Sequence, residues 1–458
     1  MKITLRFNPI VIILLCFCQV AFPKACLSQE LSNVAEIHAL YSRSTVTQPT
    51  FKGKTVTAVF YDDIGKPMSF AIQDYEGTPG IRVISRVPVS VGKKVNVTGV
   101  FEKVRGERVL KGTSVKIVSS GAPVPKPMCV RATDIGGGPK ESQQAVVDDA
   151  TAVPAPKLAK GINNTGLYVK LFGRVTASVN TGSYDSYFYI SDGAIVNTLW
   201  GEKIELGIRD GSGHIGIRCR PPADSNTKRA GALPAVDEYV EVTGVVGTYE
   251  INGLAARYIW TTSWKPADMC TYAVDIPYAG FNLLSLPGQP VDPDPLIVFQ
   301  GFEIDGMLFR WDDYYQGLDA YNAFEPDWFE PVNNSTGYWL NATHSGTIRY
   351  LGYKDLDKSD KWISLGAGWH IVGVPFTHNT RWDDWKATDG TLVKSIQTAR
   401  GQMLSSEIYG WDPATQTVLP VGLNCDQARI KQLDFGRGYW IRTYRDIALI
   451  APSGSVAP

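Results

Sequence analysis

Two segments of this 458-residue chain contain the same three short motifs in the same order. In residues 166–262 the motifs are FYISD, GIRC and VEVTGV, and in residues 51–118 they are FAIQD, GIRV and VNVTGV. Apolar and polar residues alternate around these motifs in short runs, which is typical of β-strands separated by turns. Five or six strands in about 70 residues fit a small closed barrel. We therefore expect two barrels, at 51–120 and 161–265.

A different duplication occupies the last third of the chain. The motifs GFNLLSLP, WD and GYW follow one another in residues 275–355, and GWHIVGVP, WD and GYW follow in residues 360–453. Each unit is expected to form a handful of antiparallel strands, and the two units to pack into one β-sandwich-like body. The expected fold class is therefore mostly β, with two barrels followed by a duplicated antiparallel module.

The barrel motifs resemble those of OB-fold domains found in exported bacterial proteins, over about 70 residues of the first segment and about 100 of the second. The C-terminal units are similar to the duplicated "GWNLISLP…WD…GYW" modules of secreted bacterial surface proteins. Both resemblances imply an exported protein built from β modules. A shared fold does not imply a particular ligand.

The N-terminus has the features of a secretory signal. Lys2 and Arg6 precede an apolar run over 10–18, which is too short to span a bilayer comfortably. We expect residues 1–28 to be a signal peptide and 29–50 to be a polar lead-in. The mature protein is then expected to be secreted or held at the cell surface.

Two segments between the β units have a distinct composition. Residues 121–160 are rich in proline and glycine, which predicts a flexible connector between the barrels. The glycines at 136–138 are followed by Pro-Lys-Glu instead of Gly-Lys-Ser/Thr, so they do not indicate a phosphate-binding loop. Residues 381–405 have loosely spaced apolar positions and are expected to have helical potential.

The cysteines do not indicate a metal site. Cys129, Cys219, Cys270 and Cys425 follow the predicted signal peptide, and no CxxC pair occurs. Cys219 takes the place of Val83 in the other barrel, which predicts a buried core residue. Cys129 and Cys270 each follow one barrel, directly after a methionine, and we predict a disulfide between them in an oxidising compartment.

The sequence contains no catalytic signature. The five histidines are scattered and share no metal-ligand spacing, and there is no nucleophile elbow, P-loop or Rossmann fingerprint. Acids at 312–330 lie among aromatic residues, as in a glycosidase cleft. However, Asp312 recurs as Asp412 in the second unit, which favours a turn residue. We expect no enzyme activity, cofactor or metal, and keep a glycan-active hydrolase as the alternative.

Charge is distributed unevenly, although the net charge is zero. Residues 51–120 carry 12 Lys and Arg against 6 Asp and Glu, whereas residues 271–458 carry 14 against 22. Barrel residues that alternate with core positions are expected to face outward, where basic and aromatic side chains either hold single-stranded nucleic acid or form a solvated basic face. The candidates are Arg82, Arg86, Lys103, Arg105 and Arg108 in the first barrel, and Tyr189, Arg218 and Arg220 in the second.

The first C-terminal unit is aromatic and acidic. Residues 271–350 contain 16 aromatic residues, 11 acids and only two basic residues, Arg310 and Arg349. This composition suits a polysaccharide or a protein partner, or a tryptophan-rich core, better than it suits nucleic acid. The aromatic residues predicted to be exposed are Tyr314, Tyr315 and Trp328; those predicted to pack in the core are Trp311, Trp339, Trp411 and Trp440.

These observations favour an exported, non-catalytic binding or scaffold protein of the cell surface or extracellular matrix, in which repeated modules supply avidity. One alternative is extracellular binding of single-stranded nucleic acid by the barrels. Another is glycan binding, or accessory action on glycans, by the C-terminal module. The partner stays open among a polysaccharide, single-stranded nucleic acid and another surface protein.

Overall fold

The computed structural model of the protein describes residues 30–31, 48–62, 64–74, 77–140, 143–182, 185–199, 201–221, 233–313, 315–355, 359–422 and 432–454. The predicted signal peptide and most of the predicted lead-in lie outside these residues. In the part of the chain that is described, no helix combines the length and the apolar character needed to cross a membrane.

The first barrel is closed by five strands, because the first strand of the barrel pairs with both its second and its fourth. The order is β2-β3-β4-β6-β5, with β5 returning to β2, and β4 runs parallel to β6. A short strand, β1, adds in parallel to β2. The bounds are β1 (Glu30–Leu31), β2 (Thr50–Tyr61), β3 (Pro67–Gln73), β4 (Ile81–Ile84), β5 (Lys94–Val104) and β6 (Glu107–Ser119).

The second barrel has the same closed order, β10-β11-β14-β16-β15 with β15 returning to β10, and the same parallel pair, β14 and β16. The predicted OB-like barrels are therefore confirmed. A hairpin inserted after β11 accounts for part of the longer interval between the motifs of this barrel. The bounds are β10 (Tyr168–Val179), β11 (Tyr187–Ser191), β12 (Ile195–Asn197), β13 (Lys203–Glu205), β14 (Ile217–Arg220), β15 (Tyr239–Ile251) and β16 (Leu254–Pro266).

The C-terminal third forms two units, each with one antiparallel strand pair and one four-stranded sheet. In the first unit β17 pairs with β22, and the sheet order is β18-β21-β19-β20. In the second unit β23 pairs with β32, and the sheet order is β24-β31-β28-β29. The corresponding strands therefore follow one another in the same sequence in both units.

The first unit comprises β17 (Met269–Ile276), β18 (Gly280–Ser285), α2 (Pro295–Val298), β19 (Leu308–Asp312), β20 (Gly317–Ala320), β21 (Gly337–Ala342) and β22 (Gly346–Tyr353). The second comprises β23 (Lys361–Leu365), β24 (Gly368–Gly373), β25 (Thr380–Arg381), β26 (Lys386–Thr388), β27 (Val393–Ser395), α3 (Ile396–Ala399), β28 (Glu407–Asp412), β29 (Thr417–Gly422), β30 (Gln432–Leu433), β31 (Gly438–Thr443) and β32 (Ile447–Ala451).

The helical potential expected over 381–405 is realised only in two short pieces, a 3-10 turn at Trp382–Asp384 and α3. The segment also contains short strands, because β26 extends the sheet by pairing with β32 and β27 pairs with β26. Trp382 and Trp385 are fully buried in the core of the second unit. Tertiary burial of these rings therefore decides the local structure, and the spacing of apolar residues does not.

Tryptophans join the two C-terminal units crosswise. Trp311 of the first unit lies edge-on to Trp440 of the second, with 4.8 Å between ring centroids. Trp339 and Trp411 make the reciprocal contact at 4.9 Å. The four rings, predicted as core residues, are half-buried and form an interface between the units.

Two glutamines make a reciprocal backbone contact at the same interface. Gln316 and Gln416 occupy the turns after β19 and β28, each with a left-handed φ of 53°. The amide oxygen of Gln316 accepts from the N–H of Trp369 at 2.7 Å, and that of Gln416 accepts from the N–H of Phe281 at 3.0 Å. Each unit thus holds the first sheet strand of the other.

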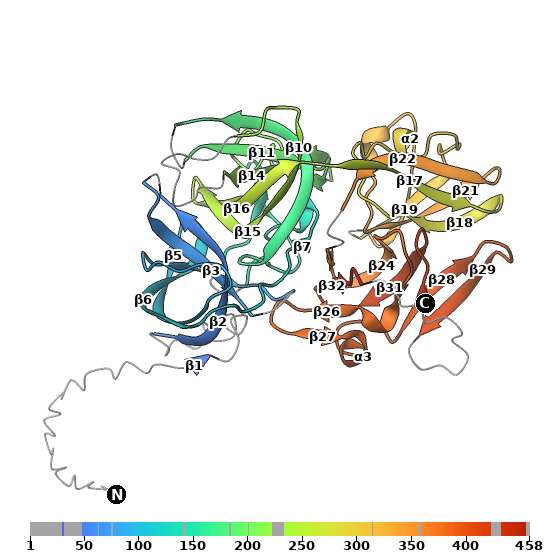
Figure 1. The fold of residues 1–458 in the computed structure, drawn as a ribbon. Helices are drawn as coiled ribbons and strands as arrows, with labels where there is room; N and C mark the ends of the chain where they lie inside the picture. Colours follow the sequence, from blue (N-terminus) through green and yellow to red (C-terminus); the bar gives the residue numbers. More distant parts are fainter. Residues whose placement is uncertain are drawn as a thin grey trace, which may run out of the picture.

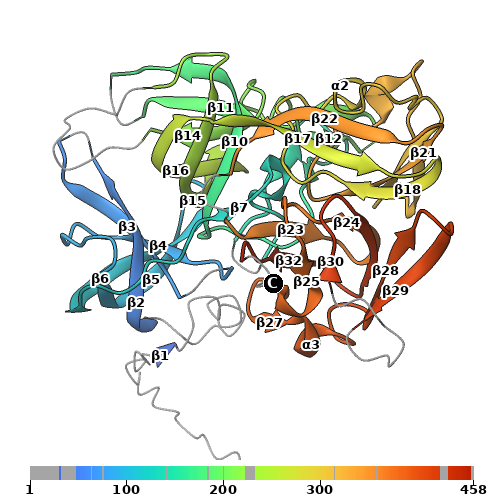
Figure 2. The ribbon, with the colours of Figure 1, turned by 45° about the vertical axis from the view of Figure 1, so that its right-hand side comes forward.

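A two-residue strand connects the barrels to the C-terminal units. β7 (Met128–Cys129) pairs in parallel with β10 on one side and with β23 on the other. The result is one ten-stranded sheet that runs from the second barrel into the second C-terminal unit. Figure 1 shows the barrels on one side of the molecule, the C-terminal units on the other and β7 between them, and Figure 2 shows the same arrangement from a second direction.

The segment at 121–160 packs against the second barrel, which the prediction of a flexible connector did not anticipate. It contains β7, β8 (Val147–Asp149) and β9 (Lys157–Leu158), and the side chains of Ile135 and Val146 are fully buried. Gly136 has φ +85°, and a Cβ there would lie 2.5 Å from Val146. The glycines at 136–138 thus permit close packing of the connector.

A buried ion-pair cluster holds the three strands at β7 together. Cys129 is in register with Lys170 of β10 and Lys361 of β23. Asp355 accepts from both lysines, at 2.8 Å from Lys170 Nζ and 2.5 Å from Lys361 Nζ. The side chains of the two lysines are 0% and 9% exposed, so Asp355 supplies the charge that offsets their burial.

Replacing Asp355 with asparagine is expected to lower the free energy of unfolding by about 3 kcal/mol or more, because two buried ammonium groups lose their counter-charge. Urea unfolding of the full chain measures this loss. The matched control is Glu102→Gln, which removes an acid from the exposed pair with Lys111 and is expected to cost below about 0.5 kcal/mol. Equal losses in both variants would contradict a central role for Asp355.

Candidate functional site

The structure buries half of the barrel residues that were predicted to form a ligand-binding face. Arg82, Arg108, Tyr189 and Arg220 are buried, with exposed fractions of 2–6%. Arg218 is half-buried, and Arg86, Lys103 and Arg105 are exposed. The predicted outward exposure is therefore wrong for the first four. The faces that carry Arg82 and Arg220 are covered because each lies against the other barrel.

Arg82 points away from the core of its own barrel but into the contact with the second barrel. Its Nε and Nη2 atoms each donate to Glu107 at 3.0 Å, and its guanidinium lies 4.1 Å from the ring centroid of Trp260. Trp260 Nε1 donates to the same Glu107 carboxylate at 2.9 Å. This cluster links the two barrels, and its donors to Glu107 are not available to a phosphate.

The aromatic partners of the second-barrel residues are also supplied by the protein. The guanidinium of Arg218 lies between the rings of Tyr187 and Tyr249, 3.8 and 3.9 Å from their centroids. Tyr189 lies 4.7 Å from the ring of His214, in the segment that follows the inserted hairpin. Tyr187, Tyr189 and Tyr249 therefore already contact other side chains of the second barrel through their rings.

Between the barrels lies a cavity of about 230 Å³, the interbarrel cavity. Three of the predicted residues, Arg82, Arg105 and Arg220, line it together with Trp260 and Tyr258. Arg86 instead pairs with Asp62 at 3.4 Å on the surface of the first barrel. Lys103, Arg108 and Arg218 do not line the cavity. The structure thus brings three of the eight predicted residues into one place.

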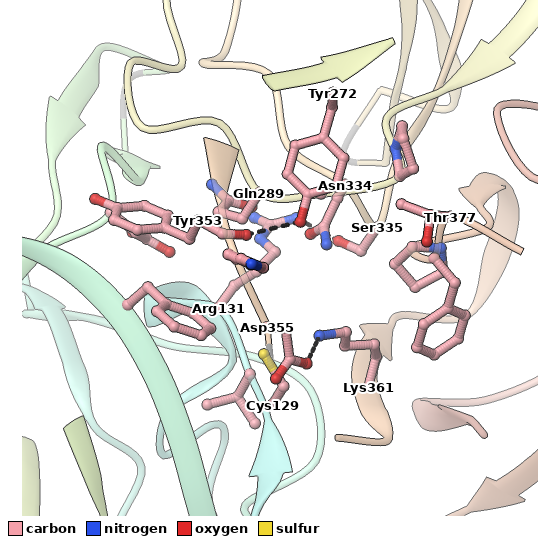
Figure 3. A pocket seen from close by; sticks show the side chains of 18 of the residues that line it. Cys129, Arg131, Tyr272, Gln289, Asn334, Ser335, Tyr353, Asp355, Lys361 and Thr377 are labelled. Carbon is pink, nitrogen blue, oxygen red and sulfur yellow. Dashed lines mark hydrogen bonds and ion pairs between the residues drawn. The ribbon is translucent and has the colours of Figure 1, made fainter. Parts of the chain in front are cut away.

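Two further cavities lie where the connector meets the second barrel and both C-terminal units. One, the thiol chamber, has a volume of about 270 Å³ and is lined by Cys129, Cys270, Tyr272 and Lys361, among others. Figure 3 shows Asp355 and Lys361 on one side of this chamber, with Tyr272, Asn334 and Ser335 on the other. Its walls come from four parts of the chain that are far apart in sequence.

The predicted disulfide is not present in the structure, which has Cys129 and Cys270 as free cysteines. Both nevertheless line the thiol chamber. Burial raises the pKa of the Cys129 thiol, although the charge of Lys361 acts in the opposite direction. A thiol with a raised pKa is a poor nucleophile, so the chamber does not have the character of a cysteine active site.

Interactions within the ion-pair cluster shift the pKa values of Asp355 and Lys361. Burial acts to raise the pKa of Asp355, but the charges of Lys361 and Lys170 outweigh it and the pKa is lowered. Burial acts to lower the pKa of Lys361. The interactions of Lys361 with Cys129 and Asp355 outweigh this effect, and the pKa is raised. Asp355 and both lysines are therefore charged at neutral pH, as the ion-pair geometry requires.

The other cavity, the polar chamber, has a volume of about 290 Å³ and shares Arg131 and Ser335 with the thiol chamber. Arg131 donates to Ser335 Oγ at 3.2 Å, and this bond lies where the two chambers meet. Within the described chain, three residues that line the polar chamber each have a buried polar atom without a hydrogen-bond partner. The atoms are Asp134 Oδ2, Asn197 Oδ1 and Trp311 Nε1.

These three atoms come from three separate elements. Asp134 ends a short 3-10 turn of the connector (Ala132–Asp134), Asn197 ends β12 of the inserted hairpin, and Trp311 belongs to β19. Burial raises the pKa of Asp134 to about 6, with Arg131 acting in the opposite direction. The chamber therefore offers two acceptors and one donor, and one acceptor titrates slightly below neutral pH.

The other acids of the polar chamber are engaged in ion pairs. Arg310 lies 3.2 Å from Asp312 and 2.6 Å from Glu330. Nδ1 of His370 lies within hydrogen-bond distance of Asp313 Oδ1 at 2.8 Å, and Nε2 of that histidine lies 2.8 Å from the carbonyl of Gly366. Of the acids that the sequence suggested for a glycosidase cleft, Asp312, Asp313 and Glu330 thus have basic or histidine partners, whereas Glu325 and Asp327 are exposed and lie outside the chamber.

The predicted surface aromatics are exposed where they are described. Tyr315 is 71% exposed and Trp328 is 61% exposed. Tyr314 lies outside the described residues. None of the cavities described above is lined by either exposed ring. Among the residues that the structure places, no group of three or more His, Cys, Asp and Glu side chains is arranged to hold a metal ion.

Sequence reasoning missed Arg131, Asp134 and Asn197. Asp134 and Arg131 lie in the connector, which was expected to be flexible, and Asn197 lies in the insertion of the second barrel. No motif surrounds these residues. The only available signal was the position of Asn197 in a segment that the first barrel lacks.

Comparison with protein-family models, with curated protein sequences and with solved structures found no match for this chain.

Asp134→Asn is expected to stabilise the protein at alkaline pH. Because the folded-state pKa of Asp134 is raised to about 6 from 3.8, its ionisation opposes folding. The stability that protonated Asp134 contributes is fully present below pH 3.8, the lower pKa, and is lost as the pH rises through about 6, the folded-state pKa. The variant should therefore gain about 1–3 kcal/mol in unfolding free energy at pH 8 and little near pH 4. Urea unfolding at both pH values measures this, and a loss at pH 8 would contradict it.

Proposed function

We propose that this chain is an exported, non-catalytic binding protein of the cell surface or extracellular matrix, and that the polar chamber binds a saccharide unit. The observation that carries the proposal is that three residues lining one cavity each have a buried polar atom without a hydrogen-bond partner in the described chain: Asp134 Oδ2, Asn197 Oδ1 and Trp311 Nε1. An unsatisfied buried polar group costs about 1–3 kcal/mol, so a ligand that satisfies all three gains binding energy from each.

The pattern of donors and acceptors favours hydroxyl groups. A hydroxyl donates one hydrogen bond and accepts two, so a polyol can donate to Asp134 and Asn197 and accept from the indole N–H of Trp311. The chamber walls carry the acids Asp134, Asp312, Asp313 and Glu330 against the cations Arg131 and Arg310. This balance disfavours an anionic ligand and is compatible with a neutral sugar.

Binding without hydrolysis is favoured by the state of the carboxylates. Asp312 and Glu330 both contact Arg310, whose pKa is raised because these acids and Asp319 outweigh the opposing effect of burial. Glycoside hydrolysis requires one carboxylic acid and a second, reactive carboxylate. Asp134 has the raised pKa of an acid catalyst, and a glycan-active enzyme therefore remains the alternative to simple binding.

Two further features support the proposal of an exported protein built from repeated modules. The basic and apolar pattern at residues 1–18 supports a signal peptide. The shared strand order of the two C-terminal sheets, together with the shared GYW and WD motifs, supports a duplicated module of the kind that secreted surface proteins contain. Tyr315 and Trp328 are exposed on the first of these units and supply a surface for a longer glycan or a protein partner.

Single-stranded nucleic acid is the weaker candidate. Its proposed stacking residue, Tyr189, is buried, and Arg82 is held by Glu107. Arg86, Lys103 and Arg105 are the predicted basic residues that stay exposed on the first barrel. Binding through these alone would be steeply salt-dependent, because phosphate contacts release counterions.

The proposal predicts that Trp311→Phe weakens saccharide binding by about 3- to 10-fold, because it removes one hydrogen-bond donor and keeps the ring. The mature protein is first tested against an oligosaccharide array, and the affinity for a bound glycan is then measured by calorimetry. Trp411→Phe is the matched control, since the indole N–H of Trp411 donates to the carbonyl of Phe281 at 2.7 Å.

Retained affinity in the Trp411 variant and reduced affinity in the Trp311 variant would support the polar chamber as the site. Equal effects of both substitutions would point to the interface between the C-terminal units instead. If no glycan on the array binds the mature protein, the saccharide proposal fails.

A further inference from the structure

The interbarrel cavity shares no residue with the polar chamber and is lined by both apolar and charged side chains. Its apolar walls are formed by Met68 and Ile84 of the first barrel and by Tyr249, Tyr258 and Trp260 of the second. An engineered apolar cavity of about 150 Å³ binds benzene. The interbarrel cavity, at about 230 Å³, is large enough for one aromatic ring and a short polar substituent.

One charged residue that lines the cavity lies in the turn between β5 and β6. Arg105 occupies this turn, is exposed, and has no ion pair or side-chain hydrogen bond with any residue that the structure describes. The next residue is Gly106, and Thr248 Oγ1 lies 3.5 Å from the place that a Cβ of Gly106 would take. Thr248 therefore lies beside the turn that carries Arg105, and both residues line the cavity.

Thr248 supplies the second observation that points to a ligand. Its side chain is 3% exposed, and its hydroxyl has no hydrogen-bond partner in the described part of the chain. A buried hydroxyl without a partner is costly, and it gains an acceptor if an oxyanion enters the cavity beside it. The guanidinium of Arg105 can donate to the same oxyanion.

The charges around the cavity favour an anion. Glu107 is already satisfied by Arg82 and by the indole N–H of Trp260. Arg105 and Arg220 add two further positive charges, and Asp185 adds one negative charge at the exposed rim. The lining thus carries three cationic and two anionic side chains, and Glu107 is neutralised within the wall.

We infer that the interbarrel cavity binds a small aromatic carboxylate, with the ring against Tyr258, Trp260 and the apolar residues and the carboxylate on Arg105 and Thr248. The site is independent of the saccharide proposal, since it shares no residue with the polar chamber.

Phenylacetate is a suitable probe, with phenylacetamide as its neutral analogue of nearly the same shape. Calorimetry on the mature protein is expected to show phenylacetate binding that is about tenfold tighter than that of the amide, because the charged hydrogen bond to Arg105 is absent from the amide. Trp260 lines the cavity, so tryptophan fluorescence gives a second readout.

Two variants locate the site. Arg105→Gln is expected to weaken phenylacetate binding about tenfold, and Thr248→Val about threefold, because each removes one donor to the carboxylate. The control is Lys116→Gln, which removes one positive charge from an exposed position of the same barrel outside the cavity and is expected to leave the affinity unchanged.

Absence of phenylacetate binding to the mature protein at millimolar concentration would overturn the inference. Equal weakening by Arg105→Gln and Lys116→Gln would also overturn it, since that result reports only the general charge of the barrel. Trp311→Phe is expected to leave phenylacetate binding intact, so failure of the saccharide proposal and failure of this one are separable.

Discussion

The assembly depends on the carboxylate of Asp355, which neutralises two lysines buried in a β-sheet. Lys170 and Lys361 belong to strands on either side of β7, and both reach Asp355 within 2.8 Å. Without this shared counter-charge, the parallel pairing that continues the second barrel into the second C-terminal unit would bury two uncompensated cations. Because Asp355 follows directly after the first C-terminal unit, the same residue also positions that unit. Both chambers at the junction exist because these three parts are held together.

The polar chamber lies where the contacts made by the two C-terminal units stop matching each other. The Trp311–Trp440 and Trp339–Trp411 pairs match, and so do the contacts of Gln316 and Gln416. The indole N–H groups differ, however: that of Trp411 donates to a carbonyl of the first unit, whereas that of Trp311 is unpartnered among the described residues. Residues of the connector and of the inserted hairpin line the chamber together with Trp311. The proposed site therefore uses one of the two matching tryptophan pairs.

Sequence periodicity predicted the barrels well, since alternation reports which residues point away from the core of their own barrel. It could not predict that Arg82 and Tyr189 are buried, because their burial depends on tertiary packing. Trp260 of the other barrel covers Arg82, and the segment that contains His214 covers Tyr189. For the same reason the connector at 121–160 was expected to be flexible, although its glycines permit burial of Val146. Asp134 gains its raised pKa only from that packing, so the sequence carried no sign of it.

Placement of both proposed sites at contacts between modules has an energetic consequence. A ligand in the polar chamber would touch the connector through Asp134, the second barrel through Asn197 and the first C-terminal unit through Trp311. A ligand in the interbarrel cavity would touch both barrels. Ligands that bind only the assembled arrangement stabilise it in proportion to the logarithm of their concentration over Kd. Each proposed site would therefore couple ligand occupancy to the relative positions of the modules.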